Sequence, residues 1–84
     1  MSEELVGKVV DFFARPVVAA VELSGNLKVG DKVHIKGHTT ELEFMLTSMQ
    51  INNTAVQQAN ANDSVGIKVA DRVRKGDEVF KVID

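Results

Sequence analysis

Residues 27–33 read Leu-Lys-Val-Gly-Asp-Lys-Val, and residues 73–79 repeat the pattern as Val-Arg-Lys-Gly-Asp-Glu-Val. Glycine adopts backbone angles that other residues avoid, and an aspartate carboxylate accepts hydrogen bonds from nearby backbone amides. Because a β-branched stretch follows each Gly-Asp pair, both copies predict a tight turn that begins a strand. The structural residues of these turns are Gly30, Asp31, Gly76 and Asp77.

Two further turns divide the rest of the chain. Ser24-Gly25-Asn26 is one, and residues 60–63 are the other, where Asn62 precedes Asp63 in place of glycine. Asparagine tolerates positive φ better than most residues, so the second turn can keep its shape. Turns at such short intervals are typical of all-β domains. The strands that we expect between the turns are 6–13, 17–23, 32–36, 42–51, 55–58, 65–69 and 79–83.

These strands predict a small closed or nearly closed antiparallel β-barrel of six or seven strands, because closure removes exposed sheet edges. Along residues 42–51 the apolar positions change parity near Thr47-Ser48, which indicates a bulge. A bend is expected at Arg15-Pro16, since proline lacks the amide hydrogen of a ladder. The predicted core consists of Val33, Ile35, Leu42, Phe44, Val65, Ile67 and Val79.

Composition limits the possible classes of protein. The 84 residues carry a net charge of −2 and include no cysteine, which excludes disulfides and thiolate metal sites. We expect a flexible N-terminal tail at 1–5 and a single β-barrel domain at 6–84. No apolar stretch is long enough to span a membrane and the N-terminus lacks signal-peptide character, so a cytoplasmic location without membrane binding is expected.

Motifs along residues 6–83 resemble the second domain of translational GTPases such as elongation factor Tu and initiation factor two. The matching stretches are Gly-Lys-Val-Val at 7–10, Ser-Gly-Asn-Leu-Lys-Val-Gly-Asp-Lys-Val at 24–33, Thr-Ser-Met-Gln at 47–50, Val-Gln-Gln-Ala at 56–59, Asp-Ser-Val-Gly-Ile at 63–67 and Arg-Lys-Gly-Asp-Glu-Val at 74–79.

The resemblance implies a barrel of the domain-two type that contacts a translational GTPase, tRNA or ribosomal RNA. The chain contains no G-x-x-x-x-G-K-[ST] loop, so GTP binding by that mechanism is excluded. Related barrels also occur at the C-terminus of collagenase-like peptidases.

Basic side chains offer a candidate contact surface for RNA phosphates or a partner. Lys32, His34, Lys36 and His38 share one parity, and Arg74 and Lys75 lie beside the second Gly-Asp turn. The alternative is a solvated outer face. If His38-Thr39 forms a two-residue turn, Lys36 faces Glu41 and His34 faces Glu43, and such cross-strand pairs contribute about 0.2–1 kcal/mol each. The net negative charge argues against nonspecific nucleic-acid binding and DNA is not expected.

Other chemistry finds little support in the residues. His34 and His38 would lie ~13 Å apart on an extended segment, too far to share a metal ion. The serines show no nucleophile-elbow context, so we expect no catalytic residue, no cofactor and no metal. Phe12-Phe13 is an apolar oddity, because neighbouring strand residues point to opposite faces. Together with Val18 and Met49 it could form a patch for a protein partner.

The sequence therefore predicts a noncatalytic, stand-alone β-barrel binding module with a role in translation. The alternative is a protein–protein accessory subunit of an enzyme such as a collagenase-like peptidase.

Overall fold

The computed structural model describes residues 2–15 and 17–83, which form strands, turns and loops without a helix. The strands are β1 (Ser2–Phe13), β2 (Val18–Leu23), β3 (Leu27–Lys28), β4 (Lys32–Lys36), β5 (Glu41–Met45), β6 (Met49–Ile51), β7 (Thr54–Ala55), β8 (Gln58–Ala59), β9 (Ser64–Lys68) and β10 (Glu78–Ile83). All pairs of neighbouring strands run antiparallel. The all-β prediction is confirmed. The bend expected at Arg15-Pro16 includes Pro16, which lies outside the described residues.

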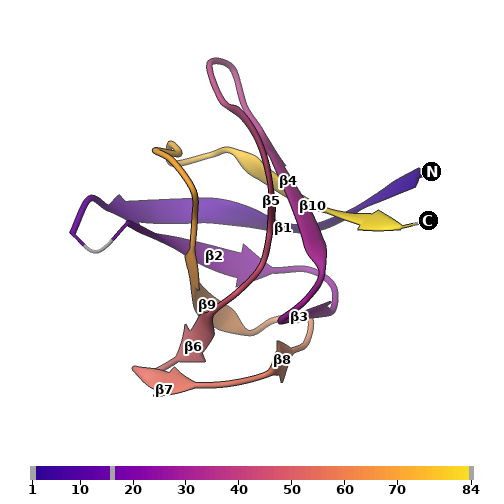
Figure 1. Cartoon of the computed structure of the whole chain (residues 1–84), viewed down its shortest axis with the longest axis vertical. Coiled ribbons are helices and arrows are strands. Elements are labelled where there is room, and N and C mark those ends of the chain that lie inside the picture. Colours follow the sequence, from indigo (N-terminus) through magenta and orange to yellow (C-terminus); the bar gives the residue numbers. More distant parts are fainter. Residues whose placement is uncertain (1, 16, 84) are drawn as a thin grey trace.

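Eight strands form one curved sheet in the order β5-β4-β10-β1-β2-β9-β6-β7, and β3 and β8 form a separate ribbon. Figure 1 shows the long strands β1 and β2 crossing the molecule, with β6, β7, β3 and β8 grouped at one end. Strands β5 and β7 are the two edges of the sheet and do not pair with each other. We expected a closed or nearly closed barrel of six or seven strands. The sheet is not closed into a barrel, and the described residues form ten strands.

Two expected strands are divided, and the described residues also form β3, which was not expected, so that seven expected strands become ten. Leu46 leaves the ladder after β5, accepting a hydrogen bond from Gly30 N–H and donating one to Asp31 C=O, each at 2.9 Å. Leu46 and Met49 are both buried, so the change of parity expected near Thr47-Ser48 is present. The expected strand at 55–58 is split between β7 and β8, because Val56 bonds to Met49 while Gln57 bonds to Val29.

Strand β1 begins before the expected position. Ser2 pairs with Ile83 and Leu5 with Phe80, so the structure places the described part of the expected tail in the sheet. The register between β1 and β10 shifts between Leu5 and Gly7, because Leu5 pairs with Phe80 and Gly7 with the adjacent Val79, which leaves Val6 as an extra residue in β1. Gly7 is needed at this point, because a Cβ atom there would come within 2.9 Å of the Glu22 carbonyl oxygen.

The core lies inside the curved sheet. Of the predicted core residues, Val33, Ile35, Val65, Ile67 and Val79 are buried. Leu42 and Phe44 are only half-buried against that core, because they belong to the edge strand β5 and have no neighbouring strand on one side.

One turn geometry occurs three times, at residues 28–31, 60–63 and 74–77. In each, the aspartate at the fourth position accepts a hydrogen bond from the first residue's N–H through Oδ2, at 3.0, 2.8 and 2.8 Å. Its own N–H donates to the first residue's carbonyl at 3.1 Å in all three turns. The third position has positive φ, at 101° for Gly30, 78° for Asn62 and 97° for Gly76. Gly25, by contrast, does not have positive φ and bonds through its N–H to Val6.

The hairpin between β4 and β5 has the predicted register. Lys36 pairs with Glu41 and His34 with Glu43, and Gly37 N–H donates to Thr40 C=O at 2.8 Å. A Cβ atom at Gly37 would collide with the buried Asp77 carboxylate. The hairpin tip therefore packs directly on the third Asp turn.

Candidate functional site

The basic residues of β4 lie on the outer face of the sheet. Lys32, His34 and Lys36 alternate with the buried Val33 and Ile35, as their shared parity indicates. Lys32 and Lys36 are exposed, whereas the His34 side chain is only 12% exposed. Part of the candidate contact surface thus exists as one row on one strand.

Glu3 reaches this row from β1, across the intervening strand β10. Its Oε2 lies 2.5 Å from His34 Nδ1 and its Oε1 accepts a hydrogen bond from Lys36 Nζ at 2.7 Å. Because Glu3 was assigned to the tail, the sequence interpretation missed it. No local pattern in Ser-Glu-Glu-Leu at 2–5 signals a strand, so only the pairing with β10 places Glu3 in the sheet.

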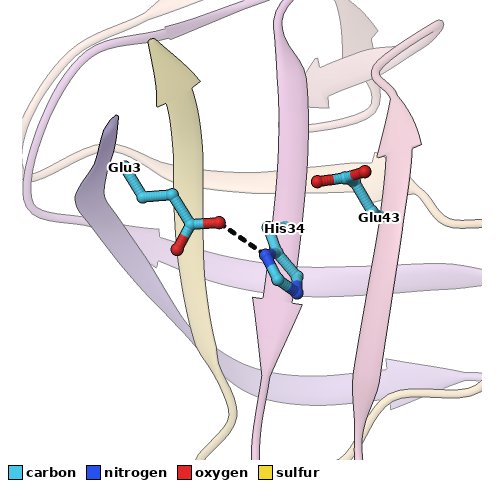
Figure 2. A group of neighbouring side chains, drawn as sticks. All are labelled: Glu3, His34 and Glu43. Carbon is cyan, nitrogen blue, oxygen red and sulfur yellow. Dashed lines mark hydrogen bonds and ion pairs between the residues drawn. The ribbon is translucent and has the colours of Figure 1, made fainter. Parts of the chain in front are cut away.

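Two glutamates of β5 complete the charged network. Glu41 Oε2 lies 3.7 Å from His34 Nε2, and Glu43 Oε1 lies 3.4 Å from Lys32 Nζ. Figure 2 shows the Glu3 carboxylate meeting the His34 ring from one side, with the Glu43 carboxylate on the other. We call Glu3, Lys32, His34, Lys36, Glu41 and Glu43 the charged network.

The network changes the acidity of two of its members. The hydrogen bond from Lys36, and then that from His34, lowers the pKa of Glu3 below its ordinary value. The same bond to Glu3 raises the pKa of Lys36. Lys36 also lies over the Phe80 ring, with Nζ 5.1 Å from the ring centroid, which is within the range of a cation–π contact.

This arrangement changes the interpretation of the basic stripe. Lys32, His34 and Lys36 each contact a carboxylate, so the charges of the two lysines are largely compensated within the sheet. The two Gly-Asp turns also lie at opposite ends of β4, since β10 begins at Glu78 beside Lys36 and β4 begins after Asp31. Lys32 and the pair Arg74 and Lys75 therefore do not form one basic surface.

His38 occupies a different place from His34. It lies at the hairpin tip, on a cavity of about 460 Å³ that Lys8, Lys36, Gly37, Gly76 and Glu78 also line. The potential metal ligands that gather around His34 are Glu3 and Glu43, with no contribution from His38.

An apolar concavity lies on another part of the outer surface. Phe13 is 51% exposed and lines a cavity of about 380 Å³ with Val18, Ala20 and Gly66. Phe12 instead packs on the core and Met49 is fully buried. The patch expected around Phe12-Phe13 thus consists of Phe13 and Val18, without Met49, because the parity change near residue 47 turns Met49 inward.

The comparisons with known proteins found a curated relative and solved structures that are similar to this chain. No family model matches the chain. A protein of Methanocaldococcus jannaschii, named an uncharacterized protease, is 42% identical over 76 residues, which is 89% of this chain but 19% of that protein. This chain therefore spans about a fifth of the length of the curated relative that it matches.

Two solved structures share the fold. Both are of the C-terminal domain of a proposed U32 peptidase from Geobacillus thermoleovorans, one of them a selenomethionine variant. They superpose with TM-scores of 0.88 and 0.85 at 17% and 16% identity, covering 95% and 90% of this chain and 93% and 96% of theirs.

These similarities contradict the assignment to the translation-factor family, including its elongation-factor domain type. The physical reason is that two of the quoted stretches contain the turns at 28–31 and 74–77, and a third begins at Asp63, the last residue of the turn at 60–63. Such turns report where strands begin, so they can occur in β domains outside the translation factors. Among the described residues, we find no helix with the length and apolar character needed to cross a membrane.

Proposed function

We propose that this chain is a noncatalytic accessory module that binds the catalytic body of a U32-type peptidase. The observation that carries the proposal is the 42% identity to one part of a larger protease-named protein. The structural likeness to a peptidase C-terminal domain supports the same role through the fold.

The surface of the molecule fits a protein-binding role. The exposed Phe13 ring stands beside a concavity whose lining includes Val18 and Ala20, and partly buried aromatic anchors in such settings dominate many protein interfaces. The His34 imidazole, which could be taken for a catalytic group, already contacts other side chains: one ring nitrogen faces Glu3 and the other faces Glu41. A module that binds without catalysis accounts for both features.

The proposal is tested by titrating the purified chain into the catalytic region of a U32 peptidase from the same organism, using calorimetry. We expect a 1:1 complex. Phe13→Asp should weaken it at least tenfold, whereas Met45→Asp, at a comparably exposed apolar residue on the distant edge strand β5, should not. No detectable complex at micromolar concentrations would count against the role, and equal effects of the two variants would exclude the Phe13 surface.

A further inference from the structure

Three potential metal ligands from three strands converge on the outer face of the sheet. Glu3 of β1, His34 of β4 and Glu43 of β5 each offer one donor atom, and these atoms lie within 4.8 Å of one another. Figure 2 shows the two carboxylates on either side of the imidazole ring. We propose that Glu3, His34 and Glu43 bind a divalent transition-metal ion, with zinc as the best match.

The donor set fits zinc chemically. Imidazole nitrogen and carboxylate oxygen bind zinc at ~2.0–2.2 Å, and three protein ligands leave room for water in the fourth position. The His34 side chain is 12% exposed and packed in place, whereas the side chains of Glu3 and Glu43 are 27% and 45% exposed. The imidazole therefore provides a fixed point. Glu3 Oε2, which lies 2.5 Å from His34 Nδ1, has to move back to admit an ion between them, and the more exposed Glu43 has to approach it.

Glu41 supplies a second observation that favours the site. A metal ion on His34 Nδ1 requires the ring proton to reside on Nε2, and Glu41 Oε2 lies 3.7 Å from that atom. A carboxylate that accepts a hydrogen bond from the second ring nitrogen orients many metal-binding histidines and selects their tautomer. At 3.7 Å Glu41 is beyond hydrogen-bond distance, so its exposed side chain has to move closer to play this part. Glu41 stands on that side of the ring, opposite the nitrogen that faces Glu3.

The lysines of the network are compatible with the ion. Lys36 contacts Glu3 through Oε1, whereas Oε2 faces His34, so an ion between Glu3 and His34 leaves the Lys36 contact in place. Lys32 contacts Glu43 through Oε1 and leaves its second oxygen available. Three carboxylates and two ammonium groups surround the ring, which leaves net negative charge for a cation.

Calorimetric titration of zinc into tag-free, chelator-treated protein tests the site. We expect one ion per chain and a rise in thermal stability with zinc concentration, because an ion that binds only the folded state stabilises it. His34→Gln should weaken binding at least tenfold, while the matched control His38→Gln, at the other histidine, should keep wild-type affinity. Glu43→Gln and Glu3→Gln should also weaken binding, and Glu78→Gln, an exposed glutamate of β10, should not.

Cobalt provides an independent readout. A d–d absorption band should appear when Co²⁺ is added to the wild-type protein, and it should be absent in Glu43→Gln. An unfolding midpoint of Glu43→Gln equal to that of wild type, measured without metal, shows that the variant is folded. Absence of stoichiometric binding with zinc in excess over protein would overturn the proposal. So would equal affinity in His34→Gln and His38→Gln. Because no peptidase is used, the result is independent of the proposed function.

Discussion

At the scale of single residues, the third position of each Asp turn has positive φ, and two of the three positions hold glycine. A Cβ atom at Gly30 or Gly76 would meet no atom within 4 Å. The cost of alanine there is therefore conformational, about 1–2 kcal/mol for a non-glycine residue in this region. We expect urea denaturation to show this loss for Gly30→Ala and Gly76→Ala, and a smaller loss for Gly30→Asn.

Gly25→Ala is the matched control, because Gly25 lacks positive φ and its nearest neighbour would lie at 3.4 Å from the new Cβ atom. Its free energy of unfolding should change little. Equal losses for Gly25→Ala and Gly30→Ala would show that the turn conformation does not limit stability.

At Gly37, the expected cost of alanine is a steric clash and not an unfavourable backbone angle. A Cβ atom there would collide with the Asp77 carboxylate, which is 5% exposed and accepts a hydrogen bond from Arg74 N–H. Overpacking of this kind costs about 1–3 kcal/mol. Gly37→Ala should lose that amount in wild type and much less in an Asp77→Ala background. Additive losses in this double-mutant cycle would contradict direct contact.

At the scale of elements, the start of β1 is coupled to β4 through Glu3 and Lys36. The pKa of Glu3 is lowered from 4.5, so its contribution to stability is present above that value and is lost as pH falls through the lowered pKa. The pKa of Lys36 is raised from 10.5, so its contribution is present below that value and is lost as pH rises through the raised pKa.

The expected result is a stability plateau between about pH 5 and pH 10. Glu3→Gln should reduce the decline on both sides, because it removes the partner of Lys36 as well as the carboxylate. Urea midpoints measured across pH with EDTA present, so that no bound metal contributes, test this. Superimposable pH profiles for wild type and Glu3→Gln would show that the contact has no energetic role.

At the scale of the whole molecule, the positive charges of Lys36 and Lys75 have different surroundings. Lys36 contacts Glu3, whereas Lys75 lies exposed on the turn at 74–77. Charge reversal of the two should therefore differ. Lys36→Glu should lower Tm, because it places a third carboxylate next to Glu3 and Glu41, and Lys75→Glu should leave Tm within about 2 °C, as for an ordinary surface substitution. Equal melting temperatures would mean that the charged network does not stabilise the sheet.

The sequence by itself determined the local features of this protein: the all-β class, the Asp turns with positive φ at Gly30, Asn62 and Gly76, and the register that opposes His34 to Glu43. These features depend on interactions within a few residues, or on the alternation of side chains along one hairpin, and so they can be derived from the order of the amino acids alone. The motifs could not identify the family, since the same turn chemistry begins strands in unrelated β modules.

Tertiary structure alone decided where the sheet stays open and which groups meet on its outer face. Leu46 bonds to the turn at Gly30 and Asp31 instead of extending a strand, and this depends on how distant segments pack. Glu3 and His34 are separated by 31 positions and meet only because β10 inserts between β1 and β4. Strand order arises from the balance of many nonlocal contacts, which no local pattern in this chain encodes, and it brings the candidate metal ligands together.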